Sequence, residues 1–170
     1  MEIHGPFAFR LDEDEVARAA VAFMRKRILL PPSRWLLIAI AVIAALLIFF
    51  DLLDGMINIG SLAAIAAVPL AIWLAIKGIA PRMARRQYRQ SAALRDEHRF
   101  FFDAETITFE GTRGKVSFPL AELHAFTDMP DLLLIHQTEG FYNPIPKRAL
   151  GEDAVKALAD ALRGAGVTQW

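Results

Sequence analysis

The sequence predicts an α+β membrane protein, with a two-helix transmembrane hairpin and a small antiparallel β domain capped by a C-terminal helix. Two apolar runs, at about residues 35–53 and 56–76, approach or reach the roughly 20 residues that a membrane-spanning helix needs. From residue 98 onward, short alternating segments are divided by Gly and Pro, as in a meander of strands. Residues 152–163 then have the period of an amphipathic helix.

Two other interpretations of the apolar runs are less compatible with the sequence. A buried hairpin of a soluble protein would need a larger protein around it than the rest of the 170 residues supplies. A signal peptide would place its apolar region within about the first 15–30 residues, whereas the first run begins at Trp35. Hydrophobic residues make up 55% of the chain, which agrees with a membrane protein.

Charged residues predict the orientation of the hairpin. The chain has 19 Lys and Arg against 19 Asp and Glu, so its formal net charge gives no argument for a nucleic-acid partner. The cations flank the two runs: Arg25, Lys26, Arg27 and Arg34 precede the first, and Lys77, Arg82, Arg85, Arg86 and Arg89 follow the second. Only Asp51 and Asp54 lie between them. Because cations near span ends stay on the cytoplasmic side, we expect both termini to be cytoplasmic.

Small residues form a stripe along the second predicted span, 56–76. They are Gly60, Ala63, Ala67, Ala71 and Ala75, spaced about one helical turn apart. Small side chains let helix backbones approach closely in lipid. The stripe therefore predicts helix–helix packing, either inside one hairpin or between copies in a homo-oligomer. Pro69 is expected to kink this span, but neither span carries an ionisable residue deep inside, which argues against a transport pathway.

A basic juxtamembrane helix is predicted at residues 78–97. Its cations Arg82, Arg85, Arg86 and Arg89 fall on one helical face. This face is a candidate contact for anionic lipid headgroups or for a partner. A topology signal in a solvated helix is the other interpretation.

The N-terminal region, residues 1–34, is predicted to be cytoplasmic and to hold a strand at 7–11 and an amphipathic helix. Asp12 and Glu15 have the spacing of a capping box. The acidic run Asp12–Glu15 is interpreted as a capping and dipole device, with cation binding as the alternative.

The cytoplasmic β domain, residues 98–170, is predicted to be one meander or half-barrel of six strands, or seven with the N-terminal strand. This outline is pleckstrin-homology-like. In the segment FYNPIPKRAL, Pro144 indicates a sheet edge or a strand end because proline has no N–H to donate. Lys147 and Arg148 belong either to a strand-to-helix corner or to a contact with lipid headgroups or a partner.

The segment Ile145–Ala149 and the order of the predicted elements resemble the YcxB-like family of bacterial membrane proteins. IPKRA is similar to the family signature IPKRAF, although Leu150 stands where an aromatic residue is common. The resemblance implies a multi-pass protein of the bacterial cytoplasmic (inner) membrane with a pleckstrin-homology-like domain. It implies no catalytic residues.

The sequence carries no motif that predicts an enzyme. There is no cysteine, and the four histidines are isolated. The segment Gly111–Gly114 is predicted as a hairpin turn, and His124 and His136 are a weak candidate metal pair. We therefore expect no cofactor, no metal and no catalysis. The expected function is a noncatalytic interaction or regulatory module for an unknown protein partner; the alternatives are a sensor of anionic lipid headgroups and a small oligomeric channel or transporter subunit.

Overall fold

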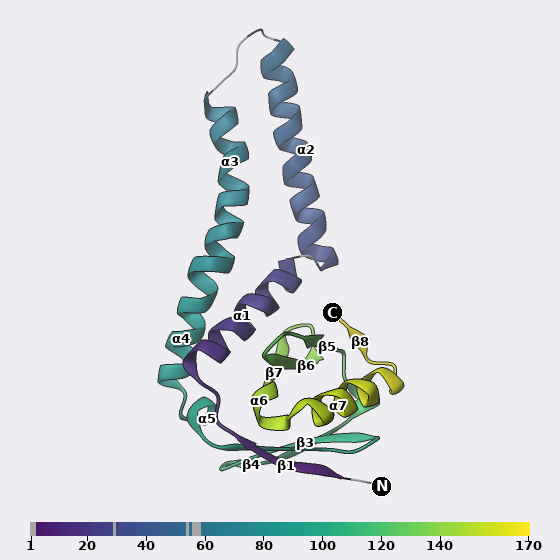
Figure 1. Ribbon diagram of the computed structural model, residues 1–170. Coiled ribbons are helices and arrows are strands. Elements are labelled where there is room, and N and C mark those ends of the chain that lie inside the picture. Colours follow the sequence, from purple (N-terminus) through teal and green to yellow (C-terminus); the bar gives the residue numbers. More distant parts are fainter. Residues whose placement is uncertain (1–2, 29, 54, 56–58) are drawn as a thin grey trace. The chain divides into compact units, whose positions relative to one another are not determined.

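The computed structural model describes residues 3–28, 30–53, 55 and 59–170, and the chain divides into two compact units (Figure 1). The first unit combines residues 1–19 with residues 84–170, and the second comprises residues 20–83. Helix α1, Glu13–Ile28, begins in the first unit and ends in the second. Asp54 and Asn58, in the predicted turn and at the start of the second span, lie outside the described residues.

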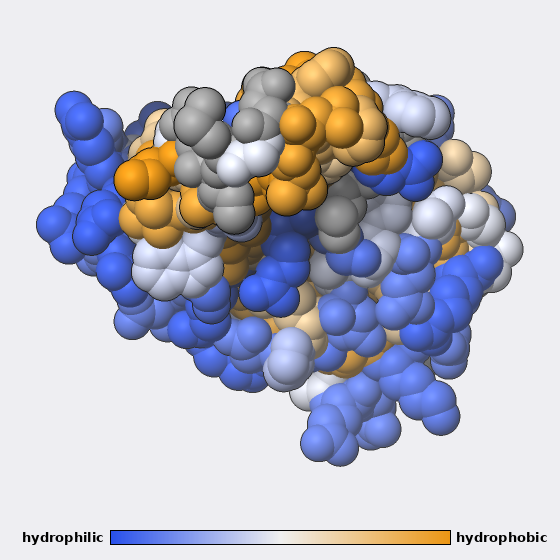
Figure 2. All heavy atoms as spheres, turned by 90° about the horizontal axis from the view of Figure 1, so that it is seen from above, coloured by the Kyte–Doolittle hydropathy of each residue, from blue (hydrophilic) through white to orange (hydrophobic). Residues whose placement is uncertain are grey.

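The second unit is helical and apolar. Helix α2 covers Pro31–Leu53, and helix α3 covers Ile59–Leu74 with Pro69 inside it. A π-helical segment, Ala75–Ile79, leads into helix α4, Ala80–Gln90. By length and composition the helical stretches Ser33–Leu53 and Ile59–Gln90 are able to cross a membrane, and none of their most apolar part is buried. Figure 2 shows the hydrophobic side chains gathered in one region, whereas hydrophilic side chains dominate the rest of that view.

The first unit contains two four-stranded sheets. In the first, antiparallel sheet the order is β1-β2-β3-β4, with β1 at His4–Phe9, β2 at His98–Phe102, β3 at Thr106–Gly111 and β4 at Gly114–Pro119. In the second the order is β7-β6-β5-β8, with β5 at Ala125–Asp128, β6 at Leu132–Thr138, β7 at Phe141–Pro146 and β8 at Thr168–Gln169. Strand β8 is parallel to β5, and the other pairs are antiparallel.

Short helices connect these strands. They are α5 at Ala92–Arg95, a 3-10 turn at Leu120–Glu122, α6 at Lys147–Leu150 and the longer α7 at Glu152–Gly164. Helix α7 buries Leu158, Ala159 and Leu162, as expected of an amphipathic helix. The α+β class is therefore as expected from the sequence.

The arrangement of the strands differs from the single predicted meander. The turn Leu120–Glu122 separates β4 from β5, and its Leu120 is buried, so the chain leaves the first sheet there and starts a second one. The N-terminal strand joins the first sheet, but it ends at Phe9 rather than at Leu11. The short strand β8 was not predicted. Alternation shows which residues share a face, but it does not show which strands pair.

The core of the first unit is apolar and continuous along β6. Residues 132–135 are fully buried, as are Phe100 and Ile107 of the first sheet and Ile145 of β7. Pro144 lies in β7, which is an edge strand of its sheet, as the sequence indicated. Since a proline at an edge costs no ladder hydrogen bond, this position is tolerated.

The side chain of Asp103 forms hydrogen bonds with the backbone of the turn between β2 and β3. Its Oδ1 accepts hydrogen bonds from the backbone N–H groups of Glu105 (2.8 Å) and Thr106 (2.7 Å), and these bonds hold its pKa below the ordinary value of 3.8. Because the folded-state pKa is lowered, the stabilisation is present above about pH 4 and is lost as the pH falls through the folded-state pKa.

We therefore expect Asp103→Ala to lower the free energy of unfolding by about 1 kcal/mol at neutral pH. The difference from the unchanged protein should shrink on acidification, as measured by chemical unfolding at pH 7 and pH 3. Asp103→Asn, whose Oδ1 still accepts both bonds, is the matched control and should lose less. An equal loss in both variants would contradict this role of the side-chain oxygen.

Candidate functional site

The acidic run Asp12–Glu15 lies at the start of α1. The backbone N–H of Asp12 donates to Glu15 Oε2 at 2.9 Å, and the backbone N–H of Glu15 donates to Asp12 Oδ1. These reciprocal bonds are the predicted capping box, which satisfies N–H groups that the helix start leaves without partners. Capping is thus confirmed as one role of this run.

Three carboxylates of the run, including Glu15 of the capping box, bind arginines from distant parts of the same unit. The pairs are Glu13 with Arg89 (2.8 Å), Asp14 with Arg85 (2.9 Å) and Glu15 with Arg148 (2.8 Å). In addition, the hydroxyl of Tyr88 donates to the carbonyl of Leu11 at 2.9 Å. Two of the four cations on the predicted basic face of residues 82–89 are therefore used to attach α4 to the N-terminal segment.

Arg148 makes the most enclosed of these contacts. Its Nε donates to Glu15 Oε1 at 2.8 Å, one Nη donates to Glu15 Oε2 at 3.1 Å, and the same Nη donates to the carbonyl of Arg10 at 2.7 Å. The Glu15 side chain is only 5% exposed. The hydrogen bonds with Glu15 raise the pKa of Arg148 above its ordinary value. Lys147 likewise forms an ion pair with Asp128.

The other two arginines of the predicted basic face, Arg82 and Arg86, do not bind the acidic run. Arg86 is an exposed residue of α4, and Arg82 lies in the second unit with one guanidinium nitrogen close to Gly78. Across the described ranges neither arginine forms an ion pair. These two cations are thus the members of the basic face that stay available for other contacts.

The small-residue stripe of the second span is exposed within the second unit. Gly60, Ala63, Ala67 and Ala71 are exposed and Ala75 is half-buried. Both predicted uses of the stripe, packing inside the hairpin and packing between copies, stay predictions.

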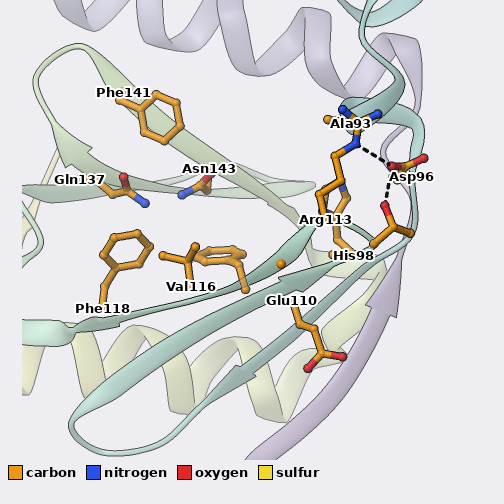
Figure 3. A pocket seen from close by; sticks show the side chains of 14 residues that line it. Ala93, Asp96, His98, Glu110, Arg113, Val116, Phe118, Gln137, Phe141 and Asn143 are labelled. Atoms are coloured by element: carbon orange, nitrogen blue, oxygen red, sulfur yellow. Dashed lines mark hydrogen bonds and ion pairs between the residues drawn. The ribbon is translucent and has the colours of Figure 1, made fainter.

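An open groove of about 450 Å³ lies in the first unit between strands of the two sheets (Figure 3). Its apolar wall consists of Phe109, Val116, Phe118 and Phe141. Val116 and Phe141 are 51% and 54% exposed, so the groove presents apolar surface to its surroundings. The groove was not predicted, because the sequence pattern does not show that β4 and β7 line the same surface.

The polar side of the groove has two acidic side chains against one basic side chain. Its charged side chains are Asp96, Glu110 and Arg113. Asp96 accepts a hydrogen bond from the Thr112 hydroxyl at 2.7 Å and lies 3.7 Å from Arg113 Nε. The side chains of Gln137 and Asn143 lie on the other side (Figure 3). A groove with this lining suits an apolar or peptide-like ligand better than a phosphate.

The predicted histidine pair is part of the packing of the second sheet. His136 is fully buried, and its Nε2 lies 3.0 Å from the hydroxyl of Thr127. The rings of His124 and His136 both contact the ring of Trp170, with centroids 5.0 and 4.8 Å away. Among the described residues, no group of three or more His, Cys, Asp or Glu side chains could hold a metal ion.

Comparison with known proteins adds no assignment. Neither a scan against protein-family models nor a search of curated proteins finds a match for this chain.

Proposed function

We propose that the chain is a noncatalytic, two-span integral membrane protein whose β-rich unit is an interaction or regulatory module for a protein partner. Two helices of sufficient length and apolarity support the membrane part of the proposal. The cations on both flanks of the spans support an orientation with both termini in the cytoplasm under the positive-inside rule. We place it in a bacterial cytoplasmic membrane, in agreement with the resemblance to the YcxB-like family.

The observation that carries the module proposal is the contrast between the arginines and the groove. Arg85, Arg89 and Arg148 already bind carboxylates of their own unit. The groove, in contrast, leaves large apolar side chains exposed and has no excess of cations. Exposed apolar surface beside a sheet edge is typical of protein-binding sites, whereas headgroup binding needs free cations.

The order of the strands supports a pleckstrin-homology-like fold for the β-rich unit. Four antiparallel strands precede three more, β5 to β7, and the long helix α7 follows them. Domains of this outline serve many unrelated functions, so the fold alone does not name the partner.

A sensor of anionic lipid is the second candidate function, because Arg82 and Arg86 are exposed and have no ion pair in the described part of the chain. Each such cation near an anionic surface contributes about 1 kcal/mol to binding. Two cations alone therefore support a weaker attachment than the whole predicted basic face would.

Photo-crosslinking of the full chain in its native membrane separates the two candidates. A photoreactive amino acid at Phe141 should give discrete protein adducts, because this side chain lies in the groove. The same amino acid at Thr108, on the outer face of the first sheet, is the control and should give few. Lipid adducts without any protein adduct at Phe141 would contradict the module and favour the sensor.

A further inference from the structure

The two sheets have four edges, and three of them are poor sites for adding a strand. Strand β1 contains Pro6 and a register shift between His4 and Phe7. Strand β7 contains Pro144 and Pro146, and β8 has only two residues. Prolines, irregular pairing and short length are the devices by which proteins protect exposed edges. Strand β4 is the exception, since it has six residues and its proline, Pro119, is the last of them.

The register of β3 and β4 shows which backbone groups of β4 face away from its sheet. Gly111 pairs with Gly114 across a two-residue turn, so these two residues exchange hydrogen bonds. In an antiparallel pair every second residue bonds to the partner strand, so Val116 and Phe118 form backbone hydrogen bonds with β3. The hydrogen bond from Leu120 N–H to Glu105 O, at 2.7 Å, continues this pattern. The N–H and C=O groups of Lys115 and Ser117 therefore point outward. Within the described part of the chain, neither residue has a hydrogen-bond partner for them.

We propose that β4 pairs antiparallel with β4 of a second copy of this chain, with Val116 at the two-fold axis. Lys115 of one copy then lies opposite Ser117 of the other, and each such pair exchanges two backbone hydrogen bonds. The side chains of Val116 meet across the axis, which covers an apolar residue that is 51% exposed in the single chain. The inference rests on the proposed interaction module and names its partner.

The neighbouring registers are unfavourable. An axis at Lys115 would place two ammonium groups directly opposite each other. An axis at Ser117 would place Lys115 opposite Pro119, which has no N–H to donate. The Val116 register satisfies all outward groups of Lys115 and Ser117 and opposes each cation with a neutral hydroxyl. The charge pattern of this strand is thus complementary to itself.

A second copy fits this edge better than a lipid headgroup. A two-fold pairing closes on itself and consumes the free edge, so it does not propagate into a fibre. In the proposed membrane protein, both copies lie in the same bilayer, which raises their effective concentration and compensates for a small interface. The adjoining groove has two carboxylates against one guanidinium, which disfavours an anionic phosphate.

Disulfide crosslinking tests the proposal directly, because the full chain of 170 residues contains no cysteine. In the proposed register the two Val116 Cα atoms are about 4.5 Å apart, as in any antiparallel pair without mutual hydrogen bonds. This separation is within the roughly 4.4–6.8 Å that a disulfide spans. We expect Val116→Cys in native membranes to form a covalent dimer under mild oxidation.

Ser117→Cys is the matched control on the same exposed strand. Its two copies lie diagonally across the axis, beyond the roughly 7 Å limit for a disulfide, so it should crosslink little. Co-expressed Lys115→Cys and Ser117→Cys chains should crosslink with each other, because these positions are opposite. Crosslinking of Val116→Cys no faster than that of Ser117→Cys would overturn the proposal.

Proline at Ser117 supplies a second test, since it removes an outward N–H and leaves the β3 ladder intact. Adding Ser117→Pro to Val116→Cys should slow dimer formation by roughly tenfold or more, because two interface hydrogen bonds are lost. Unchanged crosslinking would show random collision and would also overturn the pairing. The cysteine tests fail if no specific dimer forms. If the photoreactive Phe141 variant then still forms an adduct with a protein other than this chain, the proposed pairing of two copies is wrong, but the proposed interaction module stands.

Discussion

Replacing Arg148 with alanine is expected to lower the free energy of unfolding of the full chain by about 2–3 kcal/mol, because it leaves a buried carboxylate without its cation. The Glu15 side chain is 5% exposed and receives two hydrogen bonds from Arg148. Arg148 also donates to the carbonyl of Arg10, so the substitution removes a third bond. The loss should appear in chemical unfolding of the detergent-solubilised protein at neutral pH.

Two control variants distinguish this pair from an ordinary surface ion pair. Lys147→Ala removes the ion pair with Asp128, a contact that the structure leaves partly exposed, and should cost less than about 1 kcal/mol. Arg148→Lys should be intermediate, because an ammonium cannot form the two parallel bonds of a guanidinium. Equal losses for Arg148→Ala and Lys147→Ala would contradict the special role of Glu15.

The same pair shows where prediction from this sequence ends. The capping box was predictable because Asp12 and Glu15 are three residues apart and local geometry fixes their bonds. The hydrogen bond between Glu15 and Arg148 joins residues 133 positions apart, so no local sequence pattern predicts it. The sequence left Arg148 open between a structural corner and an external contact, and the folded chain supplies an acidic partner for it.

For the sheets, too, local features were predictable from the sequence and long-range pairing was not. Short apolar or alternating segments between Gly and Pro turns located β2 to β7, although β6 is a continuous apolar run that is buried on both faces. Alternation does not specify pairing, and so the division into two sheets and the groove between β4 and β7 were not predicted. Strand β8 has two exposed residues and lacks any alternating signal. The apolar hairpin was the easiest element to find, since its composition alone distinguishes it.

Introducing arginine at Ile43 is expected to reduce membrane integration of the full chain strongly, by about 2.5–3.5 kcal/mol, the insertion cost of a cation near the middle of a spanning helix. Ile43 is the central residue of the stretch Ser33–Leu53 and is 57% exposed. The measurement is the fraction of protein that stays in the membrane after alkaline extraction. A shift of this size changes the ratio of inserted to extracted protein by roughly a hundredfold.

Because Ile43 is exposed, the effect of arginine at this position shows whether lipid or water surrounds the helix. In water, arginine at an exposed position changes stability by no more than about 0.5 kcal/mol and would improve solubility. In lipid, the same side chain has no polar partner within the hydrocarbon, and its charge is costly. Ile3→Arg is the matched control, because Ile3 is 65% exposed and lies outside both candidate spans. Full retention of Ile43→Arg would contradict the placement of Ile43 in the hydrocarbon, and release of the unchanged chain by alkaline extraction would contradict the membrane attachment on which the proposed function depends.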